Sequence, residues 1–167
     1  GCSCIAWNGR LCHWYPGMCA VPTVRKLGSD QFGYYVAVLE FVYLRERVND
    51  VTEDEVADRV SIAKRIFIMD EATVNPEDLA WGARVSVGLD RLVDDFNLDS
   101  MAYYHRGLNG ELHERLGAGM ILGASLLTAR GVPIAGEYEL RNSIAMLIAE
   151  TIGAGGSFTE IQAINFC

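Results

Sequence analysis

The sequence predicts an α/β fold in which a mainly parallel sheet carries helices on both faces. The first reason is that strand-like and helical segments alternate along the chain, with short turns between them. The second is that half of the 167 residues are hydrophobic and only 22% are charged, which suits one packed domain. Alternating segments pair in parallel through right-handed crossovers, so we expect an open three-layer sheet of the Rossmann-like or flavodoxin-like kind.

Five segments have the composition expected of strands. They are short runs of aliphatic, β-branched and aromatic residues, and turn residues bound most of them. The segments are residues 4–9, 34–41, 100–105, 132–136 and 157–164. Between the first two, residues 10–22 (RLCHWYPGMCAVP) are predicted to form a loop, because Pro16-Gly17 and Pro22 interrupt regular structure.

Four longer segments are predicted to be helices. Thr52 is followed three residues later by Glu55, which is the capping-box spacing at a helix start. Asn75 and Pro76 open a second helix, with acidic residues that suit its N-terminal dipole directly after them. A third helix within residues 111–130 is rich in glycine, alanine and serine and is expected to pack closely on the sheet. The fourth covers residues 138–152.

Composition argues against two classes of partner. The net charge of −8, with no cluster of Lys and Arg, argues against binding to nucleic acid. The longest apolar runs, such as residues 118–127 (AGMILGASLL), are too short to cross a bilayer, and no signal peptide is visible. We therefore expect a cytoplasmic protein with no nucleic-acid or membrane partner.

The cysteines are unevenly distributed along the chain. Four of the five lie within the first 19 residues, and they are Cys2, Cys4, Cys12 and Cys19. The odd number and the apolar core favour free thiols in a reducing cytosol over disulfides. With His13 these thiols offer enough ligands for zinc, but their spacing is not that of paired Cys-x-x-Cys knuckles. We interpret them as free thiols.

Two glutamates lie at strand ends on either side of one predicted helix. Glu137 directly follows residues 132–136, and Glu160 lies within or near the end of residues 157–164. Because ligands bind outside the carboxyl ends of parallel strands, both carboxylates are expected in one crevice. There they repel each other unless they share a proton or a cation, and a hard ion such as Mg²⁺ or Mn²⁺ suits oxygen ligands. Such a site polarises a carbonyl or hydroxyl while a carboxylate moves the proton.

Ordinary structural roles also fit the candidate residues. Glu137 at a helix start is stabilised by the helix dipole without any function, and Glu160 fits a solvent-facing strand position. His13, Trp14 and Tyr15 lie near the end of the first strand, where the aromatic rings either stack on a sugar or cover the sheet end. His105 follows the third strand and either contacts substrate hydroxyls or belongs to a surface turn.

Gly136-Glu137 before a helix, followed by residues 156–160 (GSFTE), is a fairly specific pair of motifs. The pair resembles the L-arabinose isomerase and L-fucose isomerase superfamily, and most closely its arabinose isomerase-like branch. The resemblance extends over nearly the whole chain from about residue 4, including the loop from Gly9 to Met18. One departure is residues 19–24 (CAVPTV), which stand where relatives carry an acidic residue, so a substrate contact from this stretch is in doubt.

The resemblance implies an aldose–ketose isomerase that moves a proton between C1 and C2 through an enediol. It implies that Glu137 and Glu160 are metal ligands and the acid–base pair, with Mn²⁺ as the usual ion and Mg²⁺ or Co²⁺ as alternatives. The implied partners are a small-molecule sugar and further copies of the full-length chain in a homo-oligomer. The candidate sugar contacts are His13, Trp14, Tyr15, Met18 and His105.

The chain is about a third of the length of such enzymes, so we expect a fragment of a larger protein. Residues 1–155 correspond to its central α/β domain, and residues 156–167 to the entry into a truncated β-rich C-terminal domain. The family's two metal-binding histidines lie downstream of the second glutamate, so we expect no activity from this chain alone. The alternative is a non-catalytic α/β module that binds a sugar or a protein partner.

Overall fold

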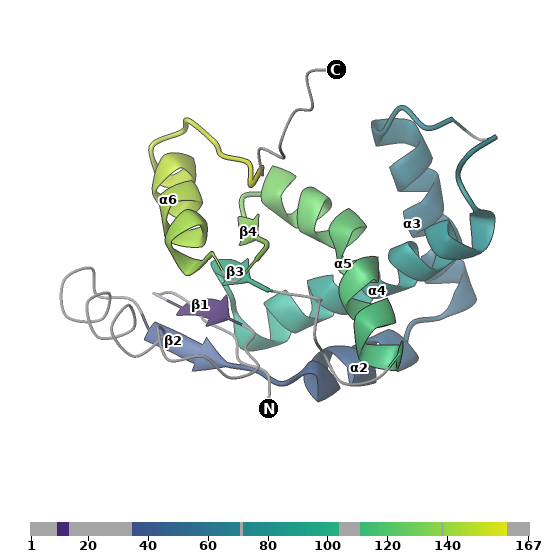
Figure 1. Ribbon diagram of the computed structural model, residues 1–167, viewed down its shortest axis with the longest axis horizontal. Coiled ribbons are helices and arrows are strands. Elements are labelled where there is room, and N and C mark those ends of the chain that lie inside the picture. Colours follow the sequence, from purple (N-terminus) through teal and green to yellow (C-terminus); the bar gives the residue numbers. More distant parts are fainter. Residues whose placement is uncertain (1–9, 14–34, 71, 104–110, 138, 160–167) are drawn as a thin grey trace, which may run out of the picture.

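The computed structural model describes residues 10–13, 35–70, 72–103, 111–137 and 139–159. Four short strands are present in these ranges: β1 (Arg10–His13), β2 (Tyr35–Val38), β3 (Ser100–Ala102) and β4 (Ile134–Ala135). The helices described are α2 (Phe41–Asn49), α3 (Glu53–Ile66), α4 (Pro76–Phe96), α5 (Glu111–Ala129) and α6 (Leu140–Thr151). Helices therefore make up most of the described chain (Figure 1).

The predicted α/β fold with a three-layer, mainly parallel sheet is wrong, because helices and not a sheet dominate the described residues. The small sheet has the order β2-β1-β3-β4, and neighbouring strands pair in parallel over three registered residues at most. The two longest helices, α4 and α5, pack mainly against each other, and α2 and α3 pack against α4. The molecule is a helical assembly with a small sheet beside it (Figure 1).

Helix α4 forms the centre of the hydrophobic core. It buries every residue from Val85 to Leu89, because α2, α3 and α5 surround it and leave no room for a polar face. Two glycines of α5 let that helix approach closely. A Cβ added at Gly119 would lie 2.8 Å from Cγ2 of Val85, and one at Gly123 would lie 2.9 Å from Cα of Ser86. The glycine-rich helix thus packs mainly on α4, and it also contacts β4 of the sheet, where the prediction had placed it.

The predicted helix starts are confirmed. At the start of α3, Oε2 of Glu55 accepts from the Thr52 amide at 2.9 Å, and Oγ1 of Thr52 accepts from the Glu55 amide at 3.4 Å. Asn75 caps α4 by accepting from the Glu77 amide at 3.0 Å, and Pro76 is its first residue. The helices expected within residues 111–130 and 138–152 are present as α5 and α6.

The strands differ more from the prediction. Strand β1 occupies residues 10–13, which were predicted as loop, while the strand expected at residues 4–9 lies outside the described residues. Helix α2 was not predicted and begins at Phe41, within the expected strand 34–41; it buries Phe41, Leu44 and Val48 at helical spacing. Residues 157–159 are not in a strand, and residues 160–164 are outside the described part.

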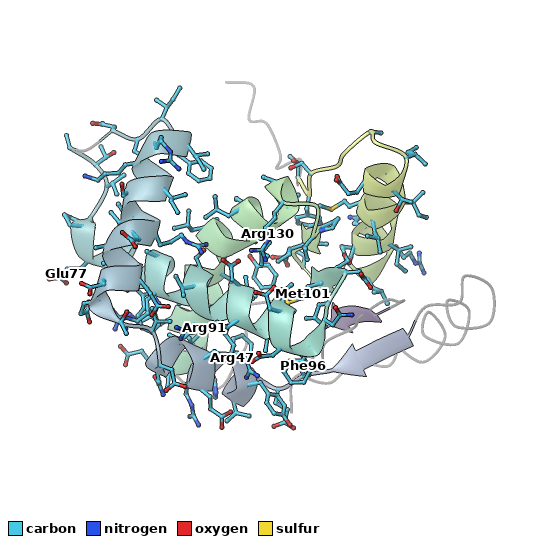
Figure 2. All side chains as sticks on the ribbon, turned by 180° about the vertical axis from the view of Figure 1, so that it is seen from behind. Arg47, Glu77, Arg91, Phe96, Met101 and Arg130 are labelled. Carbon is cyan, nitrogen blue, oxygen red and sulfur yellow. The ribbon has the colours of Figure 1, made fainter. Side chains whose placement is uncertain are left out.

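Ion pairs join the outer helices to α4, and Figure 2 labels the two arginines involved, Arg47 and Arg91. Arg47 of α2 binds Asp95 at 2.7 Å and lies over the ring of Phe96, with 5.2 Å between its Cζ and the ring centroid. Arg91 of α4 binds Glu55 at 2.6 Å. Each pair is partly exposed and contributes about 1 kcal/mol at most, so these contacts orient the helices more than they stabilise them.

The sheet brings the carboxyl ends of three strands to one edge. The Cα register pairs His13 of β1 with Ala102 of β3, and Ala102 with Ala135 of β4. On one side of β3, Met101 packs into the core around α4 (Figure 2); on the other, Ala102 packs against Met146 of α6. Residues that directly follow β3 and β4 therefore lie close together.

Helix α6 is held to β3 by a buried polar contact. The hydroxyls of Ser100 and Ser143 are 2.6 Å apart, and Oγ of Ser100 also donates to the Pro133 carbonyl at 2.7 Å. Both serines are fully buried, so each hydroxyl needs such a partner. This contact holds the first turn of α6 against β3, close to the turn that carries Glu137.

Candidate functional site

A pocket of about 700 Å³ lies beside β4, an edge strand of the sheet formed by the described residues. One wall is the face of α5, and the other is the segment 155–158 that follows α6. The residues at the carboxyl ends of β3 and β4 complete it, and they are Tyr103, Gly136 and Glu137. Its volume is sufficient for a small organic molecule such as a sugar.

Glu137 occupies an unusual backbone conformation at this pocket. Its φ of 51° lies in the left-handed region, which costs a non-glycine residue about 1 kcal/mol or more. A turn closed by the Glu139 amide, which donates to the Gly136 carbonyl at 2.9 Å, holds Glu137 there. The half-buried Glu137 lies two residues before the cap of α6 and outside its first turn, so the helix dipole alone is a weak explanation for a carboxylate here.

Tyr103 is the residue of this site that sequence reasoning missed. It follows β3 directly, its side chain is 8% exposed, and its amide donates to the Ala135 carbonyl at 3.0 Å. Burial, together with the negative charge of Glu137, raises the pKa of its phenol to about 12. The phenol is neutral at physiological pH, as in an ordinary tyrosine, and the raised pKa extends this neutral state into alkaline solution.

The segment that leads to Glu160 packs against the residue next to Glu137. A Cβ added at Gly136 would lie 3.0 Å from Cε1 of Phe158, and Phe158 packs against Ala135 and Met146. The absence of a side chain at Gly136 therefore makes room for the Phe158 ring. The two glutamate motifs, separated by all of α6 in sequence, are thus in contact through Gly136 and Phe158.

The other residues predicted for the site are only partly placed. His13 is the last residue of β1, and its backbone lies at the same sheet edge as Tyr103 and Glu137. The remaining predicted residues lie outside the described part of the chain, and they are Trp14, Tyr15, Met18, His105 and Glu160.

Carboxylate oxygens in the pocket suit a hard divalent cation in type, but those described are too few to hold one alone. Glu137 and Glu150 both line the pocket. Glu150 packs against Gly131 before β4, with Oε1 3.3 Å from where a Cβ would be, whereas Glu137 follows β4. Among the described residues, no group of three or more His, Cys, Asp or Glu side chains could hold a metal ion. An ion beside Glu137 would need further ligands.

One feature of the sequence could have identified Tyr103 as a residue of the site. It belongs to the predicted strand at residues 100–105, and the same rule that selected Glu137 selects the first residues after that strand. The prediction placed the strand end at residue 105 and so selected His105, whereas the strand ends at Ala102. An error of three residues in the strand end therefore hid Tyr103.

None of the described helices is long and apolar enough to cross a membrane.

Comparison with known proteins assigns this chain to no family. No protein-family model matches the chain, and no curated protein sequence is similar to it.

Proposed function

We propose that this chain is the part of a metal-dependent aldose–ketose isomerase, of the L-arabinose or L-fucose type, that supplies Glu137 and Glu160 to the active site. The observation that carries the proposal is the contact between Gly136 and Phe158, which brings the flanks of the two glutamate motifs together at one pocket. The resemblance of those two motifs to the isomerase family supports the same conclusion. We expect the protein to act in the cytoplasm, on a small sugar and as a homo-oligomer.

The position of Glu137 suits a residue that binds a cation and moves a proton. It is half-buried, follows a strand at the carboxyl edge of the sheet, and is held in a costly backbone conformation. Strain of this kind accumulates at functional sites, where the surrounding structure maintains it. Glu160 follows Phe158 by two residues in the sequence, which motivates its assignment as the second carboxylate.

In the proposed reaction, the two carboxylates divide the proton transfers of an aldose–ketose interconversion. One carboxylate removes the proton from C2 of the aldose and returns it to C1, so that one C–H bond breaks and one forms. The other moves the hydroxyl proton from O2 to O1. A bound Mn²⁺, Mg²⁺ or Co²⁺ would polarise the two substrate oxygens, and Glu137 and Glu160 would be its ligands from this chain.

Tyr103 would act beside Glu137 as a neutral hydrogen-bond donor. Its pKa of about 12 keeps the proton on the phenol at any physiological pH. A phenol at the pocket wall can donate to a sugar oxygen or to the Glu137 carboxylate, and either contact would orient the reacting groups. We assign Tyr103 as a positioning residue, and not as the base.

The test is Mn²⁺ binding, followed by paramagnetic broadening of amide NMR signals. Mn²⁺ should broaden the amides of Tyr103, Gly136 and Phe158 before those of α3. The variants Glu137→Gln and Glu160→Gln should each abolish this selective broadening. Glu139→Gln is the matched control, because Glu139 is exposed, lies two residues from Glu137 and makes no side-chain cap. Broadening that survives in Glu137→Gln or Glu160→Gln would rule out the paired-carboxylate site.

The alternative is a non-catalytic module that binds a sugar without a metal. One observation favours it: the described residues alone offer no set of three metal-ligating side chains. Saturation-transfer NMR with L-arabinose and L-fucose separates the two functions. Sugar contacts that appear without Mn²⁺ and persist in both glutamine variants support the binding module, whereas contacts that require Mn²⁺ and both glutamates support the isomerase.

A further inference from the structure

Three consecutive large apolar residues are exposed where α3 ends, and a fourth apolar residue follows them. Ile66 is 55% exposed, Phe67 is 37% exposed, and Ile68 at 107% stands fully out from the surface; Met69 follows them and is half-buried. Single exposed apolar residues are ordinary, but a contiguous group of large ones marks an interaction surface. We refer to residues 66–69 as the IFIM segment. Figure 1 shows the end of α3 far from α6 and from β4.

Two apolar hollows adjoin the IFIM segment. Their volumes are about 300 and 440 Å³, and Phe67, Met69 and Leu79 line both of them. Ile68, between Phe67 and Met69 in the sequence, projects beside the hollows that its two neighbours line. One face of the molecule therefore carries a projecting apolar side chain and concave apolar surface next to each other. A surface with both features can pair with a second copy of itself.

The charges that flank the IFIM segment are also self-complementary. Residues 64–71 read KRIFIMDE, with two basic residues before the apolar group and two acidic residues after it. A two-fold axis that pairs the two segments antiparallel would turn the basic end of each copy, with Arg65, toward the acidic end of the other, with Asp70, and would bring the apolar centres together. Arg65 and Asp70 are both exposed. Opposed charges at the rim of an apolar centre fix the register of such a pairing.

We propose that the IFIM segment and the two adjoining hollows are the interface of a symmetric homodimer. In a two-fold interface the same patch serves both subunits, so the Ile68 side chain of each copy enters the apolar surface of the other. An acidic partner would match only the basic end of the segment, and a basic partner only its acidic end. A second copy matches both. The interface would supply one contact of the homo-oligomer expected in the proposed function. Its residues lie outside the pocket beside β4, so loss of the dimer and loss of Mn²⁺ binding at Glu137 are separate results.

The experiment is sedimentation velocity combined with light scattering on the whole chain. The protein should be a dimer, and Ile68→Ser should weaken the dimerisation constant by about 100-fold or more, because two isoleucine side chains lose their buried surface. Ile152→Ser is the matched control, since Ile152 is 75% exposed and lies just beyond α6. It should leave the dimer intact. Both positions are exposed, so neither change threatens folding, and circular dichroism checks this.

Charge exchange tests the two-fold register. Arg65→Asp and Asp70→Arg should each weaken the dimer, because like charges then face each other across the axis, and the double variant should restore it. Arg141→Asp, at an exposed arginine of α6, should have no effect. A wild-type protein that remains monomeric would overturn the proposal. So would a dimer that Ile68→Ser leaves intact, or a double variant no stronger than either single one.

Discussion

Two glycines six residues apart on α4 should respond in opposite directions to the same substitution. A Cβ added at Gly82 would meet nothing closer than 3.9 Å, which is ordinary van der Waals contact. A Cβ added at Gly88 would lie 2.5 Å from Cγ2 of Val48. It would also lie 3.0 Å and 3.1 Å from the backbone N and Cα of Val48, so no side-chain rotation relieves the contact. Gly88 therefore sets how closely α2 packs on α4.

The expected magnitudes follow from helix propensity and overpacking. Replacing glycine with alanine inside a helix stabilises it by about 1 kcal/mol, so Gly82→Ala should raise the free energy of unfolding by about that amount. Gly88→Ala has the same propensity gain but adds overpacking against the backbone, which costs about 3 kcal/mol. It should therefore be less stable than the wild type by about 2 kcal/mol. The two variants should differ by about 3 kcal/mol.

Urea denaturation followed by circular dichroism measures the difference directly. Thermal unfolding gives a second measurement. For a chain of this size, a change of 1 kcal/mol in the free energy of unfolding shifts the melting temperature by about 2 to 4 °C, so the two variants should melt roughly 10 °C apart. Gly82→Ala serves as the control for propensity, because it makes the same chemical change on the same helix. If Gly88→Ala is as stable as Gly82→Ala, α2 does not pack on α4 as described, and the helical core is wrong.

Three further results are expected. Tyr103→Phe should make the protein less sensitive to alkali. The pKa of the Tyr103 phenol is raised from 10.0 to about 12, so its contribution to stability, about 2 to 3 kcal/mol, is fully present below pH 10 and is lost as the pH rises to 12. The free energy of unfolding, measured from pH 10 to pH 12, should therefore decline less in the variant than in the wild type. Thr52→Ala should cost about 1 kcal/mol at neutral pH. Hydrogen bonds from Thr52 lower the pKa of Glu55, so the part of the cap that involves the Glu55 carboxylate is present above the ordinary pKa of 4.5 and is lost as the pH falls through the lowered value. The bond that Thr52 accepts from the Glu55 amide does not titrate. The difference in urea midpoint should therefore narrow, without vanishing, as the pH falls below 4.5, and a constant difference would contradict the capping box. Gly136→Ala should displace Phe158 and weaken the Mn²⁺ broadening of the Tyr103 amide. The fold should persist, because the atoms that the new Cβ would meet belong to a side-chain ring, which can move, and not to the backbone. Unchanged broadening would show that the motifs of Glu137 and Glu160 act independently.

Local features were predictable because all of their atoms lie within a few residues of each other. The capping box joins Thr52 to Glu55, and the α4 cap joins Asn75 to Glu77. Neither depends on what the helix later packs against. The helices predicted within residues 111–130 and at residues 138–152 agree with α5 and α6 to within two residues.

The fold class was not predictable in this way, because it depends on whether each helix packs against the sheet or against other helices. The helix that begins at Pro76 was predicted from its N-terminal cap, but a helix face buried against a sheet and one buried among helices have the same apolar pattern. Close approach at Gly119 and Gly123 was expected from their lack of side chains. Their partner, α4, is decided by contacts between residues far apart in the sequence.

The sequence by itself determined where most helices begin and that a carboxylate, Glu137, follows a strand at the carboxyl edge of a parallel pair. These are consequences of short-range hydrogen bonding and strand direction. Only the tertiary structure decided that β3 ends at Ala102, which places Tyr103 beside Glu137, and that Phe158 lies against Gly136. A strand ends where its neighbours leave the sheet, and this depends on residues far apart in the sequence. The contact between Phe158 and Gly136 likewise joins residues that are separated by the whole of α6.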